Sequence, residues 1–182
     1  DPGAGAAPTQ MLIYVQAGDG GLVRTLGTDT SVPGSGPTTR VVYDPPLNNS
    51  EFTLQAGQRL TKTASMSTSQ LNPTLPATAS TRSTTYTFEA RETLSVQGRS
   101  YDTCRYREAP LAGGPVTVNW VVVGSGIPAR DEVRLPDGTV LQRHELLSGA
   151  VNGIALAPGP ATLDAASADR MVAEFGYVLP IC

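Results

Sequence analysis

Apolar and polar residues alternate along the centre of the chain, between Thr84 and Leu147, and this pattern predicts a meander of antiparallel strands. Between positions 86 and 96 the large apolar residues fall on even positions, whereas threonine, serine, glutamate and arginine fall on odd ones. Such alternation is typical of a sheet with one buried face. We predict that one face carries Tyr86, Phe88, Ala90, Leu94 and Val96.

The first hairpin of this meander turns at the segment 97–100, which contains a glycine. With the turn centred on Gly98 and Arg99, the predicted pairs are Val96 with Tyr101, Leu94 with Thr103, and Glu92 with Arg105. In this register Cys104 falls on the polar side of the sheet, so a chain segment that reaches it would have to cross the outside of the sheet.

The segment 116–123 is the most apolar strand of the chain, and it places Val116, Val118, Trp120 and Val122 on one face. A second hairpin follows at Asp137-Gly138, a dipeptide that suits a type I′ turn because both central residues need positive φ. A two-residue loop pairs oppositely charged side chains, which favours this register. The predicted pairs are Leu135 with Val140, Glu132 with Arg143, Asp131 with His144, and Arg130 with Glu145.

In the remainder of the chain, turn residues and β-propensity predict the strands, turns and loops. We predict strands over 11–15, 22–26, 40–43 and 61–69, with a turn at 18–21 and loops over 28–37 and 71–80, and we expect the prolines at 45 and 46 to stop the third strand. Thr162 would cap a short helix over 163–168, and residues 171–179 would form a strand. The fold class is therefore all-β, or β-dominated with one short helix, with a flexible segment 1–10 and a single domain over 11–182.

Composition excludes several function classes. The net charge is −3 at pH 7 and no basic stripe is present, so nucleic acid is not an expected partner. No apolar run approaches the roughly 18 residues of a transmembrane helix. His144 is the only histidine, and with two cysteines the chain cannot supply a recognisable zinc site. We therefore expect no metal and no cofactor.

The two cysteines, Cys104 and Cys182, fit a disulfide, two buried thiols or part of a metal site. A cysteine at the last position of the sequence is an exposed nucleophile unless it is bonded, which favours the disulfide. A disulfide would indicate an oxidising compartment, such as the periplasm or the cell surface. The small residues of segment 1–8 fit either a frayed terminus or the start of a mature chain after removal of a leader.

Three segments resemble a group of uncharacterised bacterial periplasmic proteins and lipoproteins. These segments are Phe52-Thr53-Leu54-Gln55-Ala56-Gly57-Gln58-Arg59-Leu60, the hairpin from Glu92 to Cys104, and Asn119-Trp120-Val121-Val122-Val123-Gly124-Ser125-Gly126-Ile127-Pro128. They cover the core 51–147 and leave 148–182 as an extension. That group is distantly similar to the lipoprotein carriers LolA and LolB. The resemblance implies a half-barrel, in which a curved antiparallel sheet wraps an apolar concavity, and a periplasmic or outer-membrane-anchored location.

The resulting hypothesis is a non-enzymatic envelope protein whose concave sheet face binds a lipid or another apolar small molecule that rests on Trp120. The residues expected to line this face are Tyr86, Phe88, Leu94, Val96, Val118, Trp120 and Val122. One alternative is a structural or protein-interaction module of the envelope, with a partner protein and a core filled by its own side chains. A remote alternative is a hydrolase that uses His144 with Asp131 and either Ser125 or Ser148.

Overall fold

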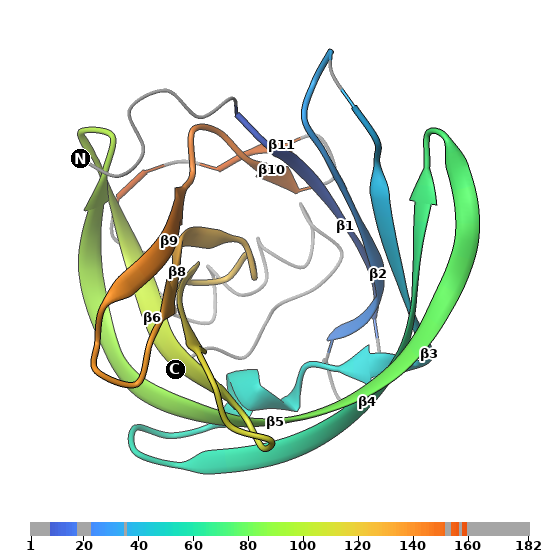
Figure 1. The fold of residues 1–182 in the computed structure, drawn as a ribbon. Helices are drawn as coiled ribbons and strands as arrows, with labels where there is room; N and C mark the ends of the chain where they lie inside the picture. Colours follow the sequence, from blue (N-terminus) through green and yellow to red (C-terminus); the bar gives the residue numbers. More distant parts are fainter. Residues whose placement is uncertain (1–7, 18–22, 35, 152–153, 157, 160–182) are drawn as a thin grey trace.

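The chain folds as an all-β protein, a single curled antiparallel sheet with the form of a half-barrel (Figure 1). The computed structural model describes residues 8–17, 23–34, 36–151, 154–156 and 158–159. Nine strands lie side by side in the order of the sequence. The strands between Thr84 and Leu147 form the meander that the alternation predicts. The predicted turn at 18–21, helix at 163–168 and strand at 171–179 lie outside the described residues. None of the described residues belongs to a helix long and apolar enough to cross a membrane.

The two longest strands, β4 and β5, lie at the middle of the sheet. The first five strands are β1 (Gln10–Ala17), β2 (Val23–Ser31), β3 (Thr39–Asn48), β4 (Arg59–Leu71) and β5 (Thr74–Val96). The next four are β6 (Arg99–Pro110), β7 (Val116–Val122), β8 (Pro128–Arg134) and β9 (Val140–Glu145). A 3-10 turn, η2 (Ser50–Thr53), joins β3 to β4, and β10 (Ala150–Val151) pairs with β11 (Ile154–Ala155) as a separate ribbon.

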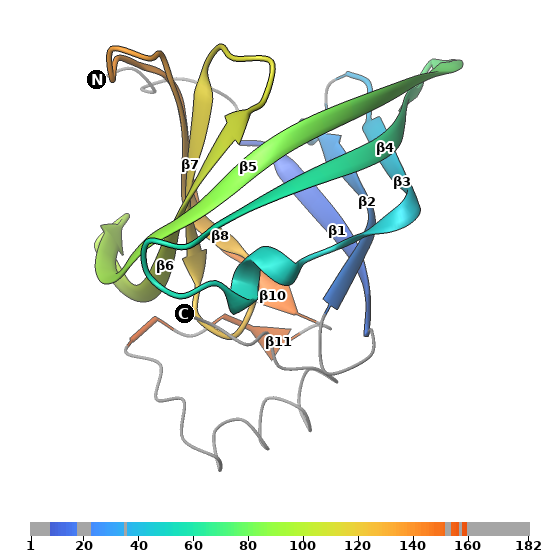
Figure 2. The same cartoon turned by 90° about the horizontal axis from the view of Figure 1, so that it is seen from below.

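The predicted loop at 71–80 is wrong in large part, because strands occupy most of it, whereas the loop predicted at 28–37 is wrong only for 28–31. β2 continues to Ser31, and β4 and β5 form one long hairpin that turns between Leu71 and Thr74 (Figure 2). Pro76 does not interrupt β5 because it falls in a bulge, where the pairing steps from Gln70–Leu75 to Thr68–Thr78. A proline inside such a bulge costs no ladder hydrogen bond. Threonine and serine, which favour the pleated conformation, supply most of the remaining positions.

The two prolines at 45 and 46 were expected to end the third strand, but β3 passes through them. Its pairing with β2 is interrupted between Val42 and Leu47, and its pairing with β4 ends at Tyr43. The prolines therefore occupy the part of β3 without ladder partners. The absence of an N–H group in these prolines therefore costs no ladder hydrogen bond.

The β5–β6 hairpin turns one residue earlier than predicted, and this shifts each pairing partner by two residues. Gln97 and Gly98 both have positive φ, at 50° and 73°, so they form a two-residue turn of the type I′ class. Val96 therefore pairs with Arg99, and Leu94 pairs with Tyr101. The predicted register was offset by two residues, which preserves the faces of the strands and changes only the partners.

The strain at Gln97 makes this turn a site for stabilisation. Asparagine tolerates the left-handed region better than glutamine does, so Gln97→Asn is expected to raise the free energy of unfolding by about 0.5 kcal/mol. Gly98→Ala, at φ 73°, should instead lower it by about 1 kcal/mol. Urea unfolding followed by circular dichroism measures both changes. A destabilising effect of Gln97→Asn would contradict the assigned turn.

The charge ladder between β8 and β9 is confirmed. Glu132 pairs with Arg143, Asp131 with His144 and Arg130 with Glu145, as the sequence predicts. The pair Leu135–Val140 is wrong, because the register shifts after Val133 and Val140 pairs with Arg134. The loop is longer than two residues: the Leu135 N–H donates to the Thr139 carbonyl at 2.9 Å.

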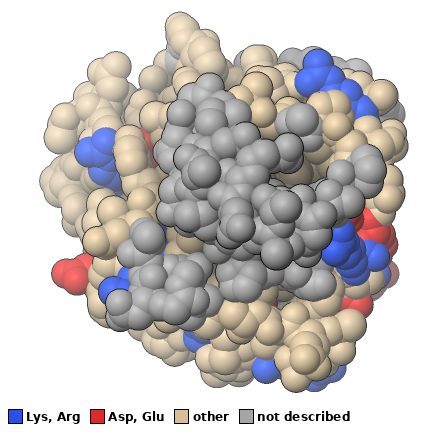
Figure 3. Space-filling view, turned by 180° about the vertical axis from the view of Figure 1, so that it is seen from behind, with Lys and Arg blue, Asp and Glu red and all other residues tan. Residues whose placement is uncertain are grey.

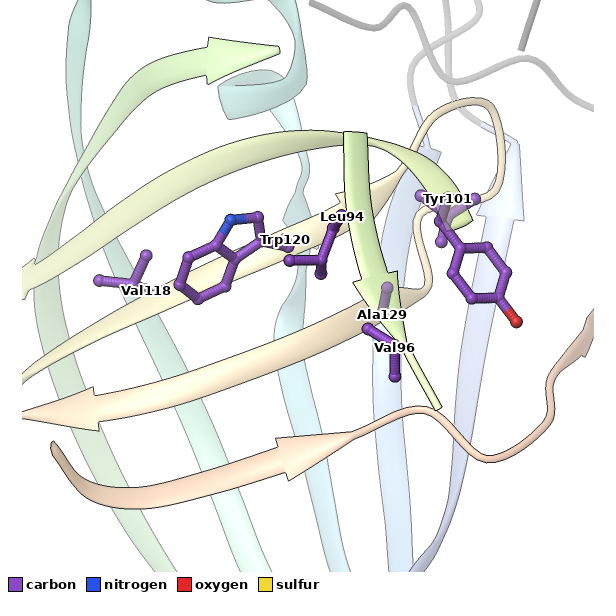
Figure 4. Packing of buried hydrophobic residues seen from close by; sticks show 7 residues of the cluster. Leu94, Val96, Tyr101, Val118, Trp120 and Ala129 are labelled. Atoms are coloured by element: carbon purple, nitrogen blue, oxygen red, sulfur yellow. The ribbon is translucent and has the colours of Figure 1, made fainter. Parts of the chain in front are cut away.

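A bulge in β5 divides the buried residues into two clusters. Pairing with β6 steps from Phe88–Tyr106 to Ala90–Arg105, so Glu89 is an extra residue, and the side chains after it change face. Tyr101 and Tyr106 differ in parity along β6 and therefore lie on opposite faces of that strand. The Trp120 cluster contains Leu94, Val96, Tyr101, Val118, Trp120, Val122 and Ala129, and Leu146 packs against it (Figure 4). The Phe88 cluster contains Phe88, Cys104, Tyr106, Val121 and Val123, with Phe52 and Leu54 packed against it.

The sheet curls tightly enough to bring β5 against β8, although two strands separate them in the sheet. Ala129 of β8 is fully buried within the Trp120 cluster, together with Leu94 and Val96 of β5. The side chain of Arg130 also reaches across and donates to the Ser95 carbonyl at 3.3 Å. This curl buries the apolar faces of β5 and β7 within the protein.

Candidate ligand-binding groove

Trp120 is held in a fixed orientation by charged neighbours. It lies at the centre of β7, and its side chain is buried in the Trp120 cluster. The indole Nε1–H donates to Glu92 Oε1 at 2.5 Å. The guanidinium groups of Arg130 and Arg134 lie 5.7 and 5.9 Å from the centroid of the ring, within the range of cation–π attraction. The tryptophan therefore lies at a boundary between an apolar cluster and a charged surface.

A groove opens over this tryptophan on the same face of the sheet. Its volume is about 290 Å³. Val116, Val118 and Trp120 contribute apolar side chains from alternate positions of β7, and the β8–β9 loop closes one end. The complete lining is Glu89, Arg105, Arg107, Val116, Val118, Trp120, Arg134, Leu135, Pro136 and Gly138.

Two of the three arginines in the groove are neutralised by carboxylates. Arg105 Nε lies 2.8 Å from Glu89 Oε2, and its Nη1 lies 3.1 Å from Glu92 Oε2. Arg134 binds Glu132 Oε2, with its Nη2 at 2.5 Å. These pairs fix the side chains of Arg105 and Arg134 along the sides of the groove.

Arg107 differs from its two neighbours in the groove. It lies on the exposed side of β6, opposite Val118 of β7. Within the described part of the chain, no carboxylate forms an ion pair with it. The groove therefore combines a floor of largely buried apolar side chains with charged sides. Among the described residues, Arg107 is the guanidinium of the groove that forms no ion pair.

Five of the seven residues predicted to line one apolar face do lie together. Leu94, Val96, Val118, Trp120 and Val122 all belong to the Trp120 cluster. Phe88 belongs to the other cluster, and Tyr86 shares the Phe88 face because it lies two positions before Phe88, ahead of the bulge. The prediction of one common face was therefore wrong for Tyr86 and Phe88. The prediction failed there because Glu89 is an extra residue in β5, and this residue reverses which face the later side chains occupy.

The sequence reasoning also missed Tyr101, Arg107 and Ala129 as neighbours of Trp120. Tyr101 was placed opposite Val96 and was not assigned to the apolar face, although it is almost completely buried there. A signal for the bulge exists in the sequence, since Ala90 and Glu92 interrupt the run of large apolar residues between Phe88 and Leu94. Arg107 carries no sequence signal, because the absence of an ion pair to it among the described residues depends on the folded surface.

Cys104 is fully buried in the Phe88 cluster, on the face opposite the Trp120 groove. The expectation that it lies on the polar side of the sheet was wrong, again because of the bulge at Glu89. Tyr106 packs beside it, with its ring centroid 5.4 Å from that of Phe52 and 5.2 Å from that of Phe88. The predicted partner Cys182 lies outside the described residues, so the disulfide stays a prediction.

A network of buried polar groups extends from the Phe88 cluster. Glu51 of η2 binds Lys62, whose ammonium lies 4.4 Å from the centroid of the Tyr86 ring. Glu108 accepts a hydrogen bond from Asn119 Nδ2 at 2.5 Å. Burial and the nearby charge of Glu51 raise the pKa of Glu108 to about 7, against opposing contributions from Arg82, Lys62 and Asn119. Burial also raises the pKa of Glu51, despite its bond to Lys62.

The histidine proposed for a hydrolase occupies an exposed position on β9. Its Nδ1 lies 2.9 Å from Asp131 Oδ1, and its Nε2 lies 2.8 Å from Gln142 Nε2. The side chain of Ser125 is buried and bonds the backbone of its own turn, donating to the Val122 carbonyl at 3.1 Å. The Asp131–His144 pair is therefore present, but Ser125 is committed to the turn after β7.

No group of three or more histidine, cysteine, aspartate or glutamate side chains that could hold a metal ion occurs among the described residues. On the face seen in Figure 3, the basic side chains of the described surface lie in separate places, and one group of them lies directly beside acidic side chains. Neither observation adds a cofactor to the groove. Among the described residues, the groove is lined mainly by tryptophan, valine and arginine side chains, together with Glu89 and the β8–β9 loop.

Comparisons of this chain with protein-family models, with curated proteins and with solved structures found no match. The likeness to the LolA and LolB carriers therefore stays a prediction from sequence. The groove is interpreted from its own geometry.

Proposed function

We propose that this protein is a non-enzymatic binding protein of the cell envelope, and that the Trp120 groove holds the acidic end of an apolar ligand. The observation that carries this proposal is the position of Arg107 beside the valine and tryptophan floor, with no carboxylate paired to it among the described residues. A guanidinium binds a carboxylate through two parallel hydrogen bonds. An apolar chain or ring attached to that carboxylate would rest on Val118 and Trp120.

The size of the groove narrows the ligand class. At about 290 Å³ it lies near the lower end of the range for small-molecule sites, about 300–1,000 Å³. A single acyl chain or one aromatic ring fits this volume better than a phospholipid with two chains does. We therefore propose a long-chain monocarboxylate, such as a fatty acid, as the ligand class.

The envelope location is supported by the sequence resemblance and by the predicted disulfide between Cys104 and Cys182. Both indicate an oxidising compartment. The curled sheet is compatible with the half-barrel that the resemblance implies. Location and ligand are separate parts of the proposal, because the groove would bind an acid wherever the protein resides.

One observation favours the alternative of a structural or interaction module. Every residue of the Trp120 cluster is at most 9% exposed, so the apolar side chains are already covered by the protein itself. In that case the arginines of the groove would be ordinary solvated side chains. The two functions differ in one measurable property, which is affinity for an apolar acid.

Titration with dodecanoate tests the proposal, because Trp120 is the only tryptophan and its fluorescence reports on the groove alone. We expect saturable binding to the unaltered protein. In Arg107→Gln the affinity should fall by about 10-fold or more, because a charge-assisted hydrogen bond is lost. Dodecan-1-ol, which has the same chain without the charge, should bind the unaltered protein more weakly than dodecanoate does.

Arg59→Gln is the matched control, since Arg59 lies on β4 and does not line the groove. It should leave the affinity for dodecanoate unchanged. Isothermal titration calorimetry gives the same constants without reliance on fluorescence. If neither method detects binding up to 1 mM, about −4 kcal/mol of binding free energy, the self-filled module is the better description.

A further inference from the structure

Among the described residues, strand β1 forms an open edge of the sheet. It pairs with β2 on one side only and lies at one end of the strand order (Figures 1 and 2). Five consecutive apolar side chains, from Met11 to Val15, are between 38% and 54% exposed. Exposed edges of this kind pair readily with another strand, because their N–H and C=O groups have no partner on the outer side.

The opposite edge of the same sheet is built differently. Strand β9 carries Arg143, His144 and Glu145, which bond to the charged residues of β8. Charged side chains on an edge strand oppose pairing with a further strand, because the charges would have to be desolvated. β1 has no charged residue and no proline. The difference between the two edges points to β1 as the interaction surface.

The sequence of β1 is symmetric in polarity about its central residue. Gln10 and Gln16 stand three positions before and after Ile13, and the five residues between them are all apolar or aromatic. An antiparallel strand of the same sequence, centred on Ile13, would match this pattern position by position. We propose that β1 pairs with β1 of a second copy of this chain, as a two-fold symmetric dimer.

The proposed pairing places apolar side chains opposite each other on both faces of the strand. Ile13 lies opposite Ile13 of the second copy, and Met11 lies opposite Val15 of the second copy on the same face. Leu12 lies opposite Tyr14 of the second copy on the other face, and the two glutamines meet at each end. The contact is isologous, so each pair of residues away from the two-fold axis occurs twice in the dimer. The extra residue of the β1–β2 bulge lies on β2, which leaves β1 regular enough to pair.

Sedimentation velocity on the full chain tests this pairing through the mass of the particle. We expect a species of twice the 19.0 kDa of one chain. Ile13→Lys places two ammonium groups opposite each other at the two-fold axis, and we expect it to weaken dimerisation by at least about 100-fold. Ile13 is 39% exposed in the monomer, so circular dichroism should show an unchanged fold. Leu12→Lys repeats the test on the other face of the strand.

Leu141→Lys on β9 is the matched control, because Leu141 is also an exposed apolar residue on an edge strand. It should leave the dimer intact. Ile13→Cys adds a test of register, since oxidation should link two copies through this residue, whereas Gln10→Cys should not link them. A wild-type chain that stays monomeric at about 100 µM, an affinity weaker than about −5.5 kcal/mol, would overturn the proposal. A dimer that Leu141→Lys breaks and Ile13→Lys leaves intact would overturn it equally.

Discussion

Trp120→Ala is expected to lower the free energy of unfolding by about 3–5 kcal/mol, which is a large part of the stability of a domain of this size. Trp120 is 5% exposed and packs at the centre of its cluster, so its removal leaves a cavity that the curled sheet cannot fill. The variant also leaves the Glu92 carboxylate without its indole donor. Urea unfolding followed by far-UV circular dichroism at 25 °C measures the change.

Two variants separate the packing of the indole from its hydrogen bond. Trp120→Phe keeps an aromatic ring and removes the N–H group, so a cost of about 1–3 kcal/mol is expected. Leu111→Ala alters a residue that is 67% exposed, and it should change the free energy of unfolding by less than about 0.5 kcal/mol. If Trp120→Ala costs no more than Leu111→Ala does, Trp120 is not a core residue and the described packing of β5 over β8 is wrong.

The second large effect is a loss of stability as the pH rises from 5 to 8. Burial and the charge of Glu51 raise the pKa of Glu108 to about 7 in the folded protein, from an ordinary value of 4.5. The folded state therefore binds more protons than the unfolded state between these two values. The stabilisation is fully present below pH 4.5 and is lost as the pH rises through 7. For this half-buried carboxyl we expect a change on the order of 2–3 kcal/mol.

Glu108→Gln tests this assignment, because glutamine keeps the shape and stays neutral at every pH. The variant should lose most of the fall in stability between pH 5 and 8, and it should be more stable than the unaltered protein at pH 8. Glu89→Gln is the control, since Glu89 lines the Trp120 groove and lies outside this network. The prediction fails if the pH profile of Glu108→Gln matches that of the unaltered protein.

The sequence predicted the second half of the sheet well, because side-chain alternation and charge pairing point to the same register there. Val116, Val118, Trp120 and Val122 occupy alternate positions of β7, and the three charge pairs of β8 and β9 support the same alignment. One face of β7 is buried throughout, which fixes its register strongly. The strands and most of their pairs therefore follow from local patterns.

The first half was harder to predict because its strands lack a buried face. Most side chains of β4 and of the first half of β5 are exposed or half-buried threonine, serine and alanine, so the sequence contains no alternation to read. Prolines at 45 and 76 were interpreted as strand breakers, although bulges and gaps in the ladder accommodate them. A segment without a buried face becomes a strand because it forms ladder hydrogen bonds with the strands on either side, and this pairing leaves no pattern in the sequence.

The candidate site was predicted in part, and one residue accounts for the error. Alternation correctly grouped Leu94 and Val96 with Val118, Trp120 and Val122, but the bulge at Glu89 moved Tyr86 and Phe88 to the other face. A single inserted residue reverses every later side chain, and the only sequence signal for it is the break in the run of large apolar residues at Ala90 and Glu92. The grouping of the arginines around the groove depends on the curl of the sheet, and the alternation of side chains does not predict this curl.

The most direct test of the central claim is the indole N–H resonance of Trp120 in a ¹H–¹⁵N correlation spectrum during titration with dodecanoate. The chain has one tryptophan, so this signal needs no assignment. We predict a saturable shift of the indole peak in the unaltered protein, and a much smaller shift at equal ligand concentration in Arg107→Gln. An indole peak that stays fixed while dodecanoate shifts backbone amides elsewhere, or shifts nothing, would contradict the Trp120 groove as the ligand site.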